Sequence, residues 1–307
     1  MAARFLSFVF CIVVGCGTEG GPGGGDRHLP NAGFGPYAWL EDGDTPKSLF
    51  PNQNRLEAPF ALSSADTVDL FFSSCPMNDT CRIVRARSQD GLLFTEPQIV
   101  ATHQDGLREP YVVRAGTGLI LWTLSADRSK VFRFDSSGSQ FEFSETILAA
   151  EPDTSFSALS VLSSGMDTEV FLRINSDDSK WIRRQVNASG PVNDILLCGS
   201  NCWSTTPPHD YELKSIRTAL GRTLFRGLGT ATNDADESTL GFIGSDDGKH
   251  WDPFQFNPVL TSDTSIESAT FAQLPGRYFI YARTGRRIPK IIMAVSRRGQ
   301  PSILPSP

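Results

Sequence analysis

A repeat of about 52 residues constrains the fold more than any other feature of this sequence. Five times along the chain, an acidic residue precedes an apolar segment that is followed by a second apolar segment. The five acids are Glu57, Glu109, Asp153, Glu212 and Glu267. A period of this length holds one supersecondary unit, and neighbouring units bury a continuous core when they stack. The chain is therefore expected to consist of five copies of one unit.

Glycine-centred turns repeat with nearly the same period. They are centred on Gly91, Gly138, Gly190, Gly248 and Gly299. The segments 88–94 and 245–251 resemble the Asp-box turn, in which an Asp or Ser side chain accepts backbone N–H groups. The glycine supplies a positive φ, and the aromatic residue at the end of the segment packs beneath the turn. Such turns join the outer strands of propeller blades, so we predict a structural role for them.

Each repeat is predicted to form four β-strands. In the first repeat these strands are expected at residues 59–63, 68–73, 82–88 and 98–102. No segment after the N-terminal region keeps a helical period for more than two turns. The sequence therefore predicts an all-β fold, a five-bladed β-propeller with four-stranded antiparallel blades. The last repeat is short of its outer strand, which residues 34–50 are expected to supply from the N-terminal side.

The N-terminal segment resembles a bacterial lipoprotein signal. The apolar run Phe5–Val14 follows Arg4 and is too short to span a bilayer. It ends in Val-Val-Gly-Cys, which predicts Cys16 as the lipidated N-terminus; an ordinary signal peptide followed by a chance cysteine is the alternative. The predicted organisation is a signal peptide at 1–15, a glycine-rich tether at 16–33 and the propeller at 34–307. The expected location is the bacterial cell envelope, as an outer-membrane lipoprotein.

Four cysteines of the predicted propeller form two locally spaced pairs. Cys75 lies close to Cys81, and Cys198 lies close to Cys202. Loop closure favours the two local disulfides, which suits an exported protein. A zinc site with four thiolates is the alternative, although neither pair has the C-x-x-C spacing typical of such sites. Both pairs fall in loops at the end of the propeller axis where the innermost strands begin, which we name the strand-start face.

The five repeated acids are the candidate catalytic residues. Each is expected at the start of an innermost strand, so that together they surround the strand-start face. Like charges at close range raise one another's pKa, so at least one acid is expected to be protonated near neutral pH or matched by a bound cation. The alternative is a structural ring of acids bonded to backbone N–H groups or arginines. Candidate ligand-binding residues at this face are Tyr111, Trp203, His209 and Asp210.

Two short segments resemble motifs of the five-bladed propeller glycosidases of the arabinanase, xylosidase and invertase type. Glu57-Ala58-Pro59-Phe60 resembles the Glu-x-Pro step that supplies their general acid, and Arg108-Glu109-Pro110-Tyr111 resembles their Arg-Asp-Pro step. The order of the two steps differs from that family, and Glu109 replaces an aspartate. The resemblance implies glycoside hydrolysis by two carboxylates, with Glu57 and Glu109 as the preferred pair. Sialidases also carry Asp-boxes, but they use six blades and an arginine triad.

Composition and motifs exclude several other functions. A net charge of −6 and the lack of a long basic cluster argue against binding to nucleic acid. No sequence signature of a metalloprotease, serine hydrolase or nucleotide-binding protein is present, and no cofactor is expected. A monomer is expected, with carbohydrate or a surface protein as its partner. Two functions stay open: a glycoside hydrolase with a solvent-open carboxylate pair, or a non-catalytic surface module whose acids are held in salt bridges.

Overall fold

A computed structural model of the chain describes residues 37–296, except for 43–44, 54, 165–166, 176–179, 187–192, 196, 198–201, 205–207, 218–222, 256 and 286–288. The predicted lipobox, the tether and Cys198 lie outside these residues. The described part is all-β, and none of it forms a helix long and apolar enough to cross a membrane.

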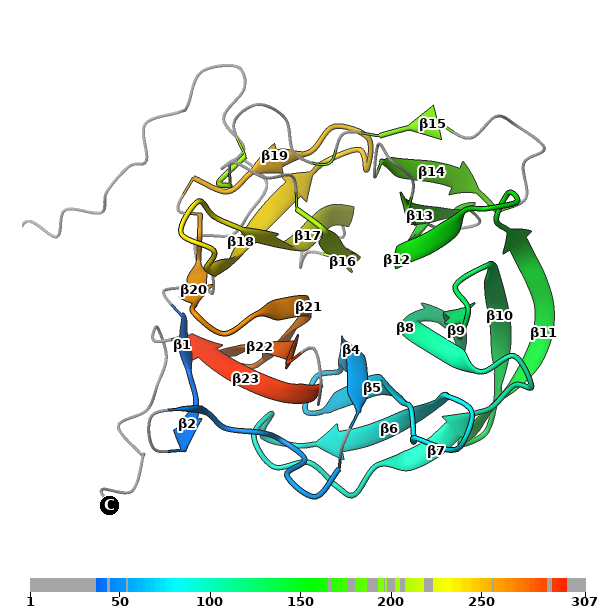
Figure 1. Cartoon of the computed structure of the whole chain (residues 1–307), viewed down its shortest axis with the longest axis horizontal. Helices are drawn as coiled ribbons and strands as arrows, with labels where there is room; N and C mark the ends of the chain where they lie inside the picture. The colour runs from blue at the N-terminus through cyan, green and yellow to red at the C-terminus, as the bar shows by residue number, and fades with distance from the viewer. Residues whose placement is uncertain are drawn as a thin grey trace, which may run out of the picture.

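Five antiparallel sheets surround a common axis and form the blades of a propeller (Figure 1). Blade one comprises β4 (Leu56–Ser63), β5 (Val68–Ser74), β6 (Arg82–Ser88) and β7 (Gln98–Ala101). Blade two comprises β8 (Leu107–Ala115), β9 (Gly118–Ser125), β10 (Lys130–Ser137) and β11 (Gln140–Ala149). Blade three comprises β12 (Ser155–Ser164), β13 (Asp167–Asn175), β14 (Trp181–Gln185) and β15 (Asn193–Asp194).

The remaining blades follow the same order. Blade four comprises β16 (Asp210–Arg217), β17 (Thr223–Thr232), β18 (Ser238–Ser245) and β19 (Asp252–Pro253), and β20 (Leu260–Ser262) also pairs with β18. Blade five comprises β21 (Ile266–Leu274), β22 (Arg277–Thr284), β23 (Lys290–Ser296) and β1 (Tyr37–Trp39). A short hairpin of β2 (Glu41–Asp42) and β3 (Thr45–Pro46) follows β1. The predicted five-bladed propeller with four-stranded blades is confirmed.

The N-terminal strand closes the ring. Strand β1 pairs antiparallel with β23, with Tyr37 opposite Ser296 and Trp39 opposite Ala294. Blade five is therefore built from both ends of the propeller, as the missing outer strand of the last repeat predicted. Figure 1 shows β1, in blue, beside the red β23 at the outer edge of the blade.

The glycine-centred turn of blade four has the predicted hydrogen bonds. Asp247 Oδ1 accepts the N–H groups of the second and third residues after it, at 2.7 and 2.9 Å. Ser245 Oγ accepts the N–H of Gly248 at 2.8 Å, and that glycine has φ +71°. The buried Trp251 donates its indole N–H to the Gly248 carbonyl. Residues 88–94 form the corresponding Ser and Asp bonds in blade one.

The innermost strands leave one edge without a strand partner. Strands β4, β8, β12, β16 and β21 each end their sheet at the axis (Figure 1). Backbone N–H and C=O groups that face the axis must therefore bond to side chains or to water. This requirement determines much of the chemistry of the axis.

Candidate active site at the strand-start face

The segments Glu57-Ala58-Pro59 and Arg108-Glu109-Pro110 both form β-bulges at the start of an innermost strand. The register of β4 shifts between Glu57 and Phe60, and that of β8 shifts between Arg108 and Tyr111. The residue before each proline has a positive φ, +47° at Ala58 and +53° at Glu109. This conformation costs an L-residue about 1–2 kcal/mol, and a bulge redirects the side chains around it. The strain and the bulge together fix the direction of the carboxylates at this face.

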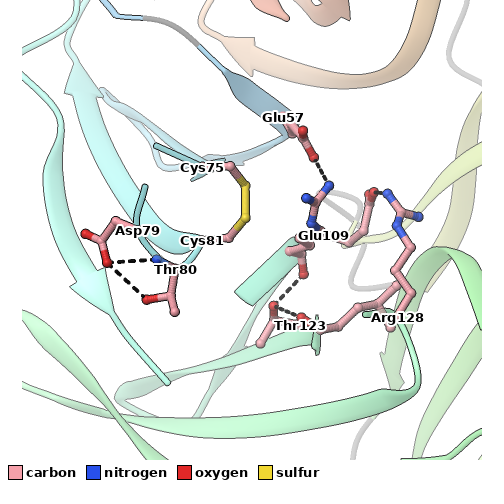
Figure 2. Close-up of a disulfide and its surroundings, with 10 residues drawn as sticks. Glu57, Cys75, Asp79, Thr80, Cys81, Glu109, Thr123 and Arg128 are labelled. Atoms are coloured by element: carbon pink, nitrogen blue, oxygen red, sulfur yellow. Dashed lines mark hydrogen bonds and ion pairs between the residues drawn. A yellow bond between two sulfur atoms is a disulfide. The ribbon is translucent and has the colours of Figure 1, made fainter. Parts of the chain in front are cut away.

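The carboxylates of blades one and two are held in two ion pairs, one that joins blade one to blade two and one within blade two. Glu57 Oε2 lies 2.6 Å from Arg108 Nη1, and Glu109 Oε1 lies 2.7 Å from Arg128 Nη2. Arg128 also donates to the Ser157 carbonyl of blade three at 2.6 Å. Figure 2 shows Glu57, Glu109 and Arg128 grouped beside the disulfide. Arg108 therefore pairs with Glu57 and not with its sequence neighbour Glu109, and the sequence did not reveal Arg128, whose role depends on the fold.

Asp210 is the acid that begins the innermost strand of blade four. Burial, followed by the nearby negative charges of Glu109 and Glu212, raises its pKa to about 8, against the backbone N–H groups of Ala269 and Tyr211, which lower it. Asp210 therefore carries a proton at neutral pH. Asp210 is not one of the five repeated acids to which the protonation prediction applied, since the sequence placed it among the ligand-binding residues.

Glu212 and Lys214, two residues apart in β16, form an ion pair at the axis. Glu212 accepts the hydroxyl of Thr270 and the N–H of Phe271, and it lies 2.8 Å from Lys214 Nζ. Lys214 donates to the carbonyls of Ala61 at 2.7 Å and Phe271 at 2.6 Å. Burial raises the pKa of Glu212 and lowers that of Lys214, and their mutual attraction opposes both shifts. The pair joins the open strand edges of blades one, four and five.

The five repeated acids lie at or just before the starts of the innermost strands, but their surroundings differ. Glu212 is the third residue of β16, two positions after Asp210, and its side chain is buried. Asp153 is exposed in the turn before β12, with φ +63°. Glu267 is half-buried and accepts a hydrogen bond from Ser265 Oγ.

His209, a predicted ligand-binding residue, lies between blades four and five. Its ring is 3.3 Å from the Ile266 carbonyl, and burial lowers its pKa.

The two aromatic residues predicted to bind a ligand have different surroundings. Tyr111 is buried against Phe60, with ring centroids 4.4 Å apart, and it borders the carboxylate cluster. Trp203 instead covers the facing glycines Gly229 and Gly241 of blade four, where a Cβ on Gly241 would lie 2.4 Å from the indole. Its position therefore supports packing of blade four and not ligand binding. The sequence did not reveal this packing role, because the space above Gly229 and Gly241 exists only where the two strands pair.

A disulfide supports the strand-start face. Cys75 and Cys81 are bonded in the loop between β5 and β6 (Figure 2). The N–H of Cys75 donates to the Arg55 carbonyl before β4 at 3.2 Å, and the Cys81 carbonyl accepts the N–H of Leu107 at the start of β8 at 2.8 Å. Cys202 is also disulfide-bonded. The Cys75–Cys81 bond rules out the four-thiolate zinc site.

Two cavities lie along the axis, one on each side of the Glu212–Lys214 pair. The first, at the strand-start face, is lined by Glu109, Asp210 and Glu212 among others and has a volume of about 20 Å³. This volume holds about one water molecule. The second, of about 490 Å³, is bordered by Lys214 and by the later residues of the innermost strands. The carboxylate cluster thus encloses too little space for a sugar ring in this conformation.

Comparisons with solved structures identify glycosidases of the same architecture. A thermostable family-43 glycoside hydrolase aligns over 83% of this chain and 97% of its own, with 11% identity and a TM-score of 0.58. A GH62 hydrolase in complex with xylotriose aligns over 84% and 94%, with 10% identity and a TM-score of 0.60. The α-L-arabinofuranosidase of Podospora anserina in complex with cellotriose aligns over 85% and 95%, with 8% identity and a TM-score of 0.57.

At these identities the comparisons address the fold alone. No protein-family model and no curated protein matches this sequence. The conclusion from structure is that the chain is a five-bladed β-propeller of the architecture found in glycoside hydrolases of families 43 and 62.

Proposed function

We propose that this propeller binds carbohydrate at the strand-start face without hydrolysing it. The absence of hydrolysis is inferred from the ion pairs that engage the carboxylates. Glu57, Glu109 and Glu212 are each paired with a cation at 2.6–2.8 Å. Glycoside hydrolysis needs two carboxyl groups on either side of the bond, about 5–5.5 or 6.5–9.5 Å apart. The space of about 20 Å³ between Glu109, Asp210 and Glu212 leaves no room for that arrangement.

Carbohydrate is the proposed ligand class because of the architecture and the polar groups at this face. Two propellers of this fold were solved with the oligosaccharides cellotriose and xylotriose. Carboxylates and guanidinium groups supply the acceptors and donors that sugar hydroxyls need. The paired Glu57, Arg108, Glu109 and Arg128 offer both kinds, already ordered by their mutual bonds.

Hydrolysis is the second candidate, and the state of Asp210 favours it. A carboxyl group with a pKa of about 8 lies near the ionised Glu109. A neutral acid beside an ionised carboxylate is the arrangement of a glycosidase acid and its partner. In this candidate Asp210 donates the proton to the leaving oxygen, and Glu109 acts as base or nucleophile after the face opens.

One experiment separates the two candidates. The purified protein is tested on a panel of arabinan, xylan, fructan, galactan and cellulose oligosaccharides, for binding by calorimetry and for released sugar. The variants are Glu57→Gln, Glu109→Gln and Asp210→Asn, with Glu145→Gln on the outer strand β11 as the matched control. We expect binding without release, weakened about tenfold by each of the first two variants and unchanged by the control.

Other outcomes have definite meanings. Sugar release that disappears in Asp210→Asn establishes hydrolysis and rejects the binding module. A protein that binds none of the oligosaccharides rejects the carbohydrate proposal, and a surface protein then becomes the expected partner.

We also propose that Cys16 anchors the protein to the outer membrane of the bacterial cell envelope, as a monomer on its glycine-rich tether. The support is the Val-Val-Gly-Cys sequence after the apolar run. Metabolic labelling with a palmitate analogue should mark the wild type and not Cys16→Ser. Labelling of both proteins, or membrane association of both, contradicts the anchor.

A further inference from the structure

The larger axial cavity lies on the far side of Lys214 from the carboxylate cluster. It has a volume of about 490 Å³, within the range of about 300–1,000 Å³ that is usual for small-molecule sites. It is lined by residues 60–63, 111–114, 214–216 and 271–273, with Val161 and Ser163. These segments are the later parts of innermost strands from all five blades. The cavity is therefore a second site, separate from the strand-start face.

The lining of this cavity is apolar and cationic. Aromatic side chains come from three blades, at Phe60, Tyr111 and Phe271. Two residues with cationic side chains, Lys214 and Arg114, contribute to the lining, and no acidic residue does. This composition contrasts with the net charge of −6 of the whole chain. An apolar body with a negative group complements such a lining.

The two cations differ in what they offer a ligand. Lys214 is paired with Glu212 and also donates to the carbonyls of Ala61 and Phe271. Its ring neighbours Phe60 and Phe271 lie 4.8 and 4.4 Å from the ammonium group. Lys214 is therefore already satisfied and serves as the boundary of the cavity.

The guanidinium group of Arg114 uses only one of its nitrogen atoms in hydrogen bonds to the described residues. Its Nη2 donates to the Ser63 carbonyl at 3.2 Å and to Ser64 Oγ at 2.8 Å. Within the described residues, no hydrogen bond or ion pair engages its Nη1 or Nε. The two bonds hold the guanidinium in place, and the remaining N–H groups can form charge-assisted bonds to a carboxylate or sulfonate.

We propose that this cavity binds a small amphipathic anion, with its apolar body among the aromatic residues of the axis and its single anionic group on Arg114. An aromatic acid and a medium-chain fatty acid share this chemistry. The proposal goes beyond carbohydrate binding, since it concerns the opposite side of the Glu212–Lys214 pair and none of the strand-start carboxylates.

The test uses two fluorescent probes of similar shape on the purified protein. Anilinonaphthalene sulfonate carries an aromatic body and one negative charge, and phenylnaphthylamine is its neutral counterpart. Decanoate and naphthoate, added as competitors, distinguish an aliphatic from an aromatic ligand. Arg114→Gln removes the charge, with Lys249→Gln in the exposed turn of blade four as its control.

A second pair of variants tests the location. Ser215 lines the cavity and is exposed, and its hydroxyl has no partner among the described residues. Ser215→Trp therefore fills open space with little cost to the core. Thr223→Trp, at an exposed position of β17 that does not line the cavity, is the control.

Expected results are specific to each variant. Arg114→Gln should weaken the sulfonate about tenfold and the neutral probe less than about twofold, and Ser215→Trp should weaken both. The controls should bind like wild type, and circular dichroism should confirm that every variant is folded. Absence of sulfonate binding to wild type, or equal binding to Ser215→Trp and Thr223→Trp, overturns the proposal. Neither result depends on whether the protein binds carbohydrate.

Discussion

At the scale of single residues, Lys214 has the largest predicted effect on stability. It neutralises the buried Glu212 and donates hydrogen bonds to two carbonyls, one from blade one and one from blade five. Lys214→Met leaves that carboxylate without its cation, so we expect the free energy of unfolding to fall by about 3–5 kcal/mol in urea titrations. The double variant Glu212→Gln/Lys214→Met should recover much of this loss, because no charge is then buried alone. A loss below about 1 kcal/mol, typical of exposed ion pairs, would contradict this role.

Asp210 makes stability depend on pH in an unusual direction. Its pKa is about 8 in the folded protein and near 4 in the unfolded chain. Between these values the folded state holds a proton that the unfolded chain has released, so the free energy of unfolding falls as pH rises. Asp210→Asn has no proton to lose. Its stability relative to wild type should therefore increase from pH 5 to pH 8 in urea titrations, by at most about 1.4 kcal/mol per pH unit. A difference that is constant over this range contradicts the proposed protonation.

At the scale of elements, the two equivalent glycine turns provide a matched comparison. Gly91 and Gly248 have similar positive φ values, +76° and +71°. A Cβ on Gly248 would meet its nearest atom at 3.6 Å, whereas a Cβ on Gly91 would lie 2.5 Å from the Phe279 ring. Gly248→Ala should therefore cost only the backbone strain, about 1–2 kcal/mol. Gly91→Ala should cost more, because the ring of Phe279 must also move. Equal losses of stability in thermal unfolding would show that the close approach has no effect.

The same elements show where sequence reasoning succeeds and where it ends. Strand positions follow from alternation and turn chemistry, which are local, and β6 was predicted with its observed bounds. The contacts of Glu57 and Glu109 depend on positive φ at Ala58 and Glu109, in bulges that composition does not reveal. Cross-blade partners such as Arg108, which pairs with Glu57 of blade one, are brought together only when the blades pack side by side.

At the scale of the whole molecule, the repeat period determined the number of blades, and the short last repeat predicted how the ring closes. The closing strand connects more than one blade. Tyr37 and Trp39 pair with β23 of blade five, and the buried Tyr37 ring lies 6.4 Å from Phe242 of blade four. Leu40 also donates to the Met293 carbonyl at 2.8 Å. Closure is thus a packing contact as well as a row of backbone hydrogen bonds.

Removal of β1 should therefore weaken the whole propeller and not only its edge. A chain that starts at residue 45 lacks this strand and exposes the β23 edge, whereas a chain that starts at residue 34 retains it. We expect the shorter chain to lose about 3–5 kcal/mol, from the burial of two aromatic side chains and the strand bonds, and to melt about 10 °C lower. A peptide of residues 34–42, added in excess, should raise the melting temperature by binding the open edge. Equal melting temperatures for the two chains, or no response to the peptide, would mean that blade five is stable without its N-terminal strand.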